Sequence, residues 1–599
     1  MRKQTFVVCV ALIIAFGVVW RHVALNAGFW SDDYLHYAML HDLYPLKRAS
    51  WDLFRFSDGS REEMQRHLDF GSFPFWSHPN FQLSMFRSLP SLSRALDERC
   101  FGNAALLHHL HTFLWWALSV CSAAGLLLRL FRPPIAVMAV FCYALDEAHS
   151  VPLVWLSNRS VLMAAAFGFV ALWAHVAWRA QPQTRTRALS IGAFILALAC
   201  GEYALSLCGY FIAIELLSRA PQRGQLRALS PFLALSVAFV IGTSLAHYGS
   251  AHSGIYASPF SEPQRFLEKL RVGVPALIAD LALTIPADWW TFGSPWPIPN
   301  FRNWQLAAGL LAPVLACALW FLGRAGLSRD EAEHARWLAL GACLSLIPVS
   351  GSFVTSRLVV IGSLGAAGFV AAIVVGSARR LSALSWRARI PCALLIAGIS
   401  WLHVVRAPLL SLETTRIYSR AAHSNTSWAL SLSLDPELAA EQRVVQIAAF
   451  DASDAAYLPF IRAQRGEPMP RTFRILSGVP CPHRLIRVSE AILDLEILCP
   501  FVLPDPFGGA LTRSTEEPVA PGTLIETEGL RIGVLEVPPG QPPRTRFGFD
   551  VPLEDPSLVF IESAAHGLRR IEIPRVGEER LIESPPLPNI DLLPPPALK

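Results

Sequence analysis

Apolar runs close to membrane-spanning length recur from the N-terminus to about Pro408. Of the 599 residues, 53% are hydrophobic and 16% are charged, below the roughly 25% typical of soluble domains. The pattern predicts a polytopic α-helical membrane protein with about 11 transmembrane helices and a further domain after them. The predicted helices cover 5–24, 104–128, 133–150, 159–178, 188–200, 202–218, 229–247, 304–323, 337–355, 357–377 and 390–408.

Positive charges set the predicted orientation, because clusters of them follow alternate helices. The clusters are Arg2 and Lys3; Arg129 and Arg132; Arg179, Arg185 and Arg187; Arg219, Arg223 and Arg227; Arg324, Arg329 and Arg336; and Arg379, Arg380, Arg387 and Arg389. With a cytoplasmic N-terminus, all of them lie in the cytoplasm, as the positive-inside rule requires. The clusters all lie on the cytoplasmic side only if 188–218 consists of two helices rather than one. The break between them puts Glu202 at an outer turn. We therefore predict a multi-pass protein of the inner or plasma membrane.

This topology leaves three long stretches outside the cytoplasm. The first extracytoplasmic loop covers 22–103 and includes an amphipathic run over 80–96 that we expect on the membrane surface. The second covers 248–303. Within it, the apolar patch 272–285 is short, and a crossing there would invert all later loops. We therefore predict a re-entrant or interfacial helix, beside an aromatic cluster that includes Trp296.

The third outer stretch is the C-terminal part of the chain, where the sequence becomes polar and proline-rich. We predict a transmembrane domain over 1–410, a β-rich or α/β extracytoplasmic domain over 411–580, and a proline-rich tail over 581–599. Turn signals such as Pro538-Pro539-Gly540 separate its strand-like pieces. Cys481 and Cys499 could pair in an oxidising compartment, and unpaired thiols are the equal alternative.

Two adjacent carboxylates, Asp32 and Asp33, follow the first apolar helix. They are either a cap for a loop helix or catalytic groups, because carboxylates at a membrane interface are costly to desolvate. The topology places further polar residues on the same side. We group as candidate site residues His78, His149, Arg159, Glu202, Tyr203, His252, Tyr256 and Arg357. Each alone is more commonly a structural cap, whereas their shared side indicates one water-facing cavity.

These residue types suit transfer of a sugar from a lipid-linked sugar phosphate. Arginine matches phosphate oxygens and stabilises the charge of a phosphate leaving group, so Arg357 and Arg159 are candidate donor-phosphate ligands. A carboxylate can take the proton of an acceptor hydroxyl. A lipid-linked donor needs no soluble nucleotide-sugar domain, and the chain lacks a Gly-rich phosphate loop of the usual kind. It also lacks a basic stripe interleaved with aromatics, which argues against nucleic-acid partners.

Several motifs resemble the GT-C superfamily, and most closely protein O-mannosyltransferases and their transmembrane relatives with TPR repeats. These are Phe29-Trp30-Ser31-Asp32-Asp33, Met85-Phe86-Arg87-Ser88-Leu89-Pro90, Ala95-Leu96-Asp97, Phe101-Gly102, His109-Leu110, His149-Ser150-Val151, Ser157-Asn158-Arg159-Ser160, Gly201-Glu202-Tyr203 and Ser356-Arg357-Leu358-Val359-Val360. They follow the order of the family over roughly 20–375. The resemblance implies a polyprenyl-phosphate donor, transfer outside the cytoplasm, and inversion at the sugar carbon.

The resemblance also implies roles for single residues. A first-loop Asp is the base, with Asp33 favoured and Asp32 open, and Arg357 binds the donor phosphate. The chain departs from the family where proline is missing after His149 and where Gly201 replaces a lysine. No TPR repeats follow the last helix. A lipid, glycan or protein can therefore be the acceptor, and a lipid or surface polysaccharide fits better than a protein.

Two other functions stay open from the sequence. A lipid-linked glycan transporter or flippase would need ionisable residues deep in the helices, whereas here the helix midsections are almost free of charge. A non-catalytic assembly subunit of the same fold is the other alternative. No cofactor is certain. Paired carboxylates near histidines can bind a divalent metal ion, although we predict that none is required.

Overall fold

The computed structural model describes residues 3–218, 224–294, 298–499, 509–537, 543–564 and 567–585. Two compact units emerge. The helical unit consists of Met1–Gly28, Met85–Ala246 and Glu262–Ser419, and the mixed unit of Phe29–Ser84, His247–Ser261 and Arg420–Lys599. The predicted first loop, 22–103, is therefore divided between the two units.

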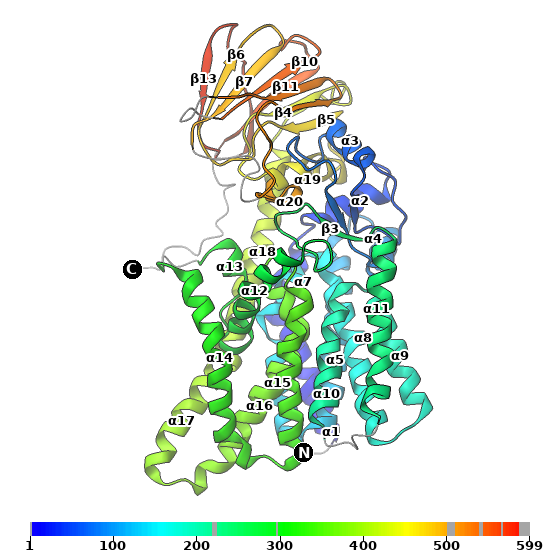
Figure 1. Cartoon of the computed structure of the whole chain (residues 1–599), viewed down its shortest axis with the longest axis vertical. Coiled ribbons are helices and arrows are strands. Elements are labelled where there is room, and N and C mark those ends of the chain that lie inside the picture. The colour runs from blue at the N-terminus through cyan, green and yellow to red at the C-terminus, as the bar shows by residue number, and fades with distance from the viewer. Residues whose placement is uncertain are drawn as a thin grey trace. The chain divides into compact units, whose positions relative to one another are not determined.

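Each of the eleven predicted apolar stretches is helical in the helical unit (Figure 1). The helices are α1 (Lys3–Trp20), α5 (Ala105–Leu130), α6 (Pro133–Ala144), α8 (Arg159–Ala180), α9 (Thr184–Leu198), α10 (Leu207–Leu217), α11 (Gln225–Leu245), α14 (Phe301–Gly323), α15 (Arg329–Val349), α16 (Val360–Arg380), α17 (Trp386–Ser400) and α18 (Ala407–Leu430). The last predicted stretch, 390–408, runs through α17 and a π-helical turn, Trp401–Arg406, into α18. Arg2, Arg219 and Arg223 lie outside the described residues.

Among the described residues, six helices are long and apolar enough to cross a membrane, judged by length and composition. The number becomes seven if α6 and the segment Glu147–Val154, bent by 46° against it, form one span. The protein is thus an integral membrane protein, and the expected total of about 11 spans stays a prediction.

The centre of the helical unit consists of α8 and α16, whose apolar windows are 78% and 83% buried. By contrast, the windows of α11 and α14 are 11% and 22% buried. Small residues let the central helices approach closely, as is common between membrane helices. A Cβ atom at Gly365 of α16 would lie 2.3 Å from the carbonyl oxygen of Leu338 in α15. Helix packing therefore depends on glycine there.

The predicted break within 188–218 is confirmed. Helix α9 ends at Leu198, and a short 3-10 helix, Glu202–Ser206, precedes α10. The backbone of Gly201 has φ +124°, a conformation that residues with a side chain rarely adopt. A Cβ atom at this position would also lie only 2.8 Å from Cγ of Arg87. The turn thus requires glycine, and it places Glu202 beside Arg87.

The apolar patch 272–285 belongs to a longer helix than predicted. Helix α12 spans Pro263–Leu283, and its first two turns are charged and include Arg265 and Lys269. It is not among the described helices that are apolar enough to cross a membrane. Trp296 lies outside the described residues.

The described residues of the mixed unit form three sheets, drawn as arrows in Figure 1. β1 (Arg55–Asp58), β2 (Gln82–Ser84) and β3 (Gly249–Ala251) join the two predicted outer loops. A six-stranded antiparallel sheet has the order β13 (Glu579–Ile582), β6 (His483–Arg487), β7 (Ile492–Ile497), β10 (Arg544–Phe549), β9 (Leu530–Val534) and β8 (Leu524–Thr527). The predicted β-rich C-terminal region is confirmed.

The third sheet has the order β12 (Gly567–Arg570), β11 (Leu558–Ala564), β4 (Arg443–Gln446) and β5 (Thr472–Ile475). β4 is parallel to both β11 and β5, and α19 (Ala452–Gln464) connects β4 to β5. This forms a β–α–β unit. Cys481 and Cys499 form a disulfide with an S–S distance of 2.10 Å, which decides between the two alternatives left open by the sequence. Residues 586–599 and Pro538-Pro539-Gly540 lie outside the described residues.

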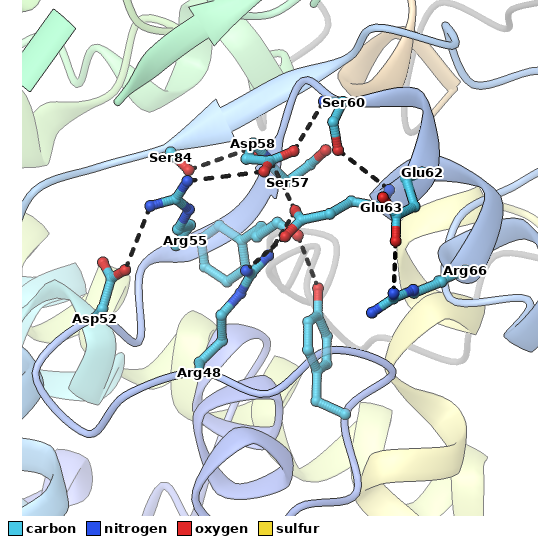
Figure 2. Close-up of polar contacts among 12 residues, drawn as sticks. Arg48, Asp52, Arg55, Ser57, Asp58, Ser60, Glu62, Glu63, Arg66 and Ser84 are labelled. Atoms are coloured by element: carbon cyan, nitrogen blue, oxygen red, sulfur yellow. Dashed lines mark hydrogen bonds and ion pairs between the residues drawn. The ribbon is translucent and has the colours of Figure 1, made fainter. Parts of the chain in front are cut away.

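A network of charges orders the first-loop part of the mixed unit (Figure 2). Arg48 forms a bidentate ion pair with Glu63 of α3 (Arg61–Phe70), with N–O distances of 2.8 and 2.9 Å. Glu63 also accepts the backbone N–H of Asp58 at 3.0 Å. The Arg48 and Glu63 side chains are only 7% and 16% exposed, and their pair fixes the Glu63 carboxylate that joins α3 to Asp58 at the end of β1.

Candidate functional site

Asp32 and Asp33 begin helix α2 (Asp32–Leu40) in the mixed unit. Asp33 is 0% exposed, and its Oδ2 accepts the backbone N–H of Trp30 at 3.0 Å. Asp32 is half-buried, and its Oδ1 accepts the hydroxyl proton of Tyr457 at 2.9 Å. The two neighbouring carboxylates thus differ: Asp33 caps the turn before α2, whereas Asp32 lies nearer to solvent.

Two tyrosine hydroxyls anchor the start of α2 within the mixed unit. Tyr34 contacts Thr426 at 2.7 Å, and Tyr457 of α19 donates to Asp32. Burial and the charge of Asp32 raise the pKa of Tyr457 well above its ordinary value, so the hydroxyl keeps its proton. Ser31, directly before α2, has φ +53°, a strained conformation for serine. The chain therefore fixes the direction of Asp32 from both sides.

Arg357 lies in the helical unit, on the 3-10 turn Ser356–Val359 before α16. Its guanidinium is centred 4.9 Å from the ring of Trp155 and 4.7 Å from that of Phe353. Nη1 donates to Asn158 Oδ1 at 3.1 Å, and Nε has no hydrogen-bond partner among the described residues. The residue is 5% exposed. A buried, planar cation with an unused donor is suited to binding an anionic group.

Asp288, from the short helix α13 (Asp288–Phe292), lies near Arg357. Its Oδ1 accepts the backbone N–H of Ser356 at 3.4 Å. Burial raises the pKa of Asp288 to about 6, against the opposing effect of that hydrogen bond and of the Arg357 charge. Its charge also interacts with Glu147. The Asp288 carboxyl group thus lies near Arg357, and burial weakens its tendency to ionise.

Arg159, the other predicted phosphate ligand, is engaged on all sides. Nη1 contacts Asp97 Oδ2 at 2.6 Å, Nε donates to Thr112 at 2.9 Å, and Nη2 donates to the carbonyl of His108 at 2.8 Å. Arg159 and Asp97 are each 1% exposed. Burial would raise the pKa of Asp97, but the hydrogen bond with His111 and the Arg159 charge outweigh it and lower the pKa. This is a closed structural ion pair.

Glu202 and Tyr203 both contact Arg87 in the helical unit. The Glu202 carboxylate forms an ion pair with the Arg87 guanidinium, which also lies 5.0 Å from the Tyr203 ring centre. Burial would raise the pKa of Glu202, but the charge of Arg87 and the hydrogen bonds from it lower the pKa. His149 is 0% exposed, and its ring packs edge-on against Tyr143 at 4.8 Å.

His78 and His252 meet Glu517 in the mixed unit, and their ligand atoms lie within 4.8 Å of one another. The two imidazole rings stack, with centres 3.7 Å apart and planes at 13°. A metal binds a histidine nitrogen in the plane of the ring, so one ion cannot satisfy both stacked rings. The backbone N–H of Asn80 also donates to Nδ1 of His78 at 3.1 Å. The group in this arrangement does not fit a divalent metal ion.

The predicted site residues therefore fall into separate groups. Asp32, Asp33, His78, His252 and Tyr256 belong to the mixed unit. Arg357, Arg159, Glu202, Tyr203 and His149 belong to the helical unit. Within each unit they form distinct clusters around different partners.

Three residues that contact the site were not predicted as part of it. Tyr457 carries no local sequence signal, because its contact with Asp32 spans 425 residues. Asp97 lies within the Ala95-Leu96-Asp97 motif, and that motif could have suggested a role for it. Asp288 directly precedes an aromatic pair, Trp289-Trp290, which could have drawn attention to it.

No protein-family model and no curated protein matches the chain. Solved structures that it resembles include the oligosaccharyltransferase of Archaeoglobus fulgidus in its apo form, with 12% identity, a TM-score of 0.43, and coverage of 79% of this chain and 65% of that one. Another is AglB from the same organism with an inhibitory peptide and dolichol-phosphate, at 11% identity, TM-score 0.42, and 79% and 64% coverage.

A further similar structure is ArnT from Cupriavidus metallidurans bound to undecaprenyl phosphate, at 14% identity, TM-score 0.38, and 79% and 90% coverage. AglB and ArnT are GT-C superfamily membrane glycosyltransferases, the superfamily that the sequence motifs resemble. The chain spans slightly less than two thirds of the length of the archaeal enzyme.

Proposed function

We propose that this protein is an integral membrane glycosyltransferase with a polyprenyl-phosphate sugar donor, acting on the extracytoplasmic face. Its acceptor is a hydroxyl of a lipid, glycan or protein. The observation that carries the proposal is Arg357, a guanidinium 5% exposed between two aromatic rings, whose Nε has no partner among the described residues. A buried donor without an acceptor is costly, and a phosphate oxygen would satisfy it.

In the proposed reaction, Asp32 acts as the base. Its carboxylate removes the proton from the acceptor hydroxyl while the hydroxyl oxygen forms a bond to the anomeric carbon. The bond from that carbon to the phosphate oxygen breaks, and its electron pair leaves with the polyprenyl phosphate. Arg357 stabilises the added negative charge. Attack opposite to the leaving group inverts the anomeric carbon.

We assign the base role to Asp32 rather than to Asp33, which the resemblance favoured. Asp33 is fully buried and accepts a backbone N–H, so it is suited to holding the start of α2. We also leave Arg159 out of donor binding, because Asp97 and neighbouring acceptors already occupy its donors. The proposed reaction contains no metal-dependent step. The carriers bound in the AglB and ArnT structures, dolichol-phosphate and undecaprenyl phosphate, are of the proposed class.

The test is sugar transfer in proteoliposomes that contain the full-length protein, polyprenyl-phosphate sugars and a membrane extract as acceptor. Asp32→Asn is expected to lower turnover at least about 100-fold while the protein still inserts. Asp42→Asn is the control, because Asp42 follows the same helix and its side chain is 71% exposed. Equal turnover of the Asp32 variant and the wild-type protein would contradict the proposal.

A further inference from the structure

Three buried carboxyl groups gather around one serine hydroxyl in the helical unit. Glu147 begins a 3-10 helix that follows α6, Asp280 lies on α12, and Asp288 begins α13. Their exposed fractions are 4%, 6% and 6%. The hydroxyl of Ser356, the residue before Arg357, interacts with all three members of this carboxyl cluster. One hydroxyl has a single proton, so it can donate to only one of the three at a time.

The carboxyl cluster has few hydrogen-bond donors. Asp280 Oδ2 accepts the backbone N–H of Ala287 at 2.9 Å, and Asp288 Oδ1 accepts that of Ser356 at 3.4 Å. Both oxygens of Glu147 and Oδ2 of Asp288 have no hydrogen-bond partner among the described residues. A buried carboxylate without donors is costly, and protonation removes its charge. In the described part of the chain, these three groups do not bring their ligand atoms within 4.8 Å of one another, so a proton suits them better than a shared metal ion.

The arginines near the carboxyl cluster are held by other groups. Arg406 donates to the carbonyl of Leu283 at 3.2 Å, and Arg21 donates to the carbonyls of Ala144 and Asp146 at 2.8 Å each. Carboxyl groups this close to one another cannot all be ionised. Accordingly, burial and the charge of Asp146 raise the pKa of Asp280 well above its ordinary value. The ionisable groups that face the cluster are the carboxyl group of Asp146, the phenol of Tyr418, and the guanidinium groups of Arg21, Arg357 and Arg406.

We propose that the carboxyl cluster couples donor binding to proton uptake: the donor phosphate binds Arg357 together with one proton, which the cluster holds. The inference rests on the proposed donor site. A phosphate at Arg357 brings a negative charge close to Asp288 and competes with it for the same guanidinium. Protonation of the cluster removes this repulsion. Because Glu147, Asp280 and Asp288 interact, the added proton belongs to the cluster rather than to one residue.

The experiment measures binding of undecaprenyl methyl phosphate to the full-length protein in detergent micelles. This phosphodiester carries no sugar, and unlike a phosphate monoester it has no second ionisation near pH 6. Isothermal titration calorimetry in two buffers with different ionisation enthalpies gives both the Kd and the number of protons taken up. The pKa of Asp288 is about 6 in the free protein. We therefore expect the Kd to rise about 5-fold to 10-fold from pH 6.5 to 7.5, with uptake of about 0.5–1 proton at pH 7.5.

Asp288→Asn keeps the side-chain size and removes the ionisable group. It should tighten binding at pH 7.5 about 5-fold and flatten the pH dependence. Glu147→Gln provides a second variant of the carboxyl cluster if Asp288→Asn does not fold, and it should act in the same direction. Glu215→Gln is the matched control, because Glu215 is a 3% exposed carboxylate on α10 whose partner is His175, at 2.9 Å. It should keep the wild-type pH dependence.

The inference is overturned if the lipid does not bind, if its Kd is the same at both pH values, or if the folded cluster variants take up as many protons as the Glu215 control. Its failure can be distinguished from failure of the proposed function. Sugar transfer together with pH-independent binding of the lipid contradicts only the proton coupling. Proton-coupled binding in a protein that transfers no sugar contradicts the glycosyl transfer and leaves a proton-coupled site for lipid phosphates.

Discussion

The hydroxyl of Tyr457 donates to Oδ1 of Asp32 at 2.9 Å across 425 residues of sequence. One partner follows the first apolar helix, and the other lies on the helix of a β–α–β unit near the C-terminus. The C-terminal region therefore belongs to the surroundings of the acidic pair rather than to a separate appendage. In the proposed reaction, Tyr457 is a positioning residue that acts through Asp32.

Tyr457→Phe should lower turnover about 10-fold to 100-fold, because a hydrogen bond to a charged group contributes about 1.5–3 kcal/mol. The KM for the donor should change little, since donor binding is assigned to the helical unit. Steady-state kinetics in proteoliposomes measure both quantities. Tyr34→Phe is the control, because it removes a hydroxyl on α2 that contacts Thr426 and Arg465 rather than Asp32. A rise in donor KM with unchanged turnover would contradict the positioning role.

Much of the helical unit could be predicted from the sequence, because apolar length and arginine position are local properties. The break within 188–218 followed from charge parity alone, and Gly201 provides the turn that it needs. The N-terminal limit of helix α12 was predicted less accurately. Its first turns are charged, so an apolar window begins at 272 whereas the helix begins at Pro263.

Side-chain partners were harder to predict than helices. Arg159 and Arg357 both lie next to the start of an apolar helix, so the sequence predicts the same role, binding of the donor phosphate, for both. The structure separates them, since Asp97 neutralises Arg159 from a segment 62 residues earlier, whereas Arg357 has aromatic neighbours. Such partners depend on tertiary packing and carry no signal in local composition. For the same reason, the contact between Asp32 and Tyr457 was not predicted.

Arg357→Lys should raise the KM for a polyprenyl-phosphate donor about 10-fold or more. Lysine keeps the positive charge but loses the planar fork that stacks between the rings of Trp155 and Phe353. Donor titration in proteoliposomes measures this effect. Arg302→Lys is the control, because Arg302 also lies over a ring, that of Trp290, but is exposed. If both variants have the wild-type KM, Arg357 does not bind the donor.

Arg159→Lys should affect stability rather than donor binding. The substitution removes several of the donors that satisfy Asp97, Thr112 and the carbonyl of His108. Breaking a buried ion pair costs about 3–5 kcal/mol, and lysine retains part of the interaction, so we expect the free energy of unfolding to fall by about 3 kcal/mol. Thermal unfolding in nanodiscs measures the change. A normal melting temperature with a raised donor KM would return Arg159 to the donor site.

Glu63→Gln should destabilise the mixed unit by about 3 kcal/mol, because it leaves the buried Arg48 guanidinium without its charged partner. Glu62→Gln tests the same substitution one residue earlier. There the ion pair with Arg66 is exposed, with side chains 57% and 78% accessible, and should contribute at most about 1 kcal/mol. Limited proteolysis of the purified protein compares the two variants. Equal sensitivity would show that the network in Figure 2 does not order this region.

His67 should make the mixed unit sensitive to acid. Burial, together with the charge of Arg48, lowers the pKa of this histidine from 6.5 to about 3, and its nitrogens contact Ser72 Oγ and the carbonyl of Phe56. Between pH 6.5 and about 3, His67 binds a proton in the unfolded chain but not in the folded unit. Stability is therefore complete above pH 6.5 and falls as the pH decreases towards 3.

At pH 5 the loss attributable to His67 is about 2 kcal/mol. His67→Gln should lower stability at neutral pH, because the glutamine replaces buried hydrogen bonds imperfectly, but it should flatten the decline between pH 6.5 and 5. Chemical unfolding monitored at several pH values measures both effects. His41→Gln, at an exposed position just after α2, should leave the decline unchanged. If the His67 variant and the wild-type protein lose stability in parallel over this range, protonation of His67 does not limit the acid stability of the mixed unit.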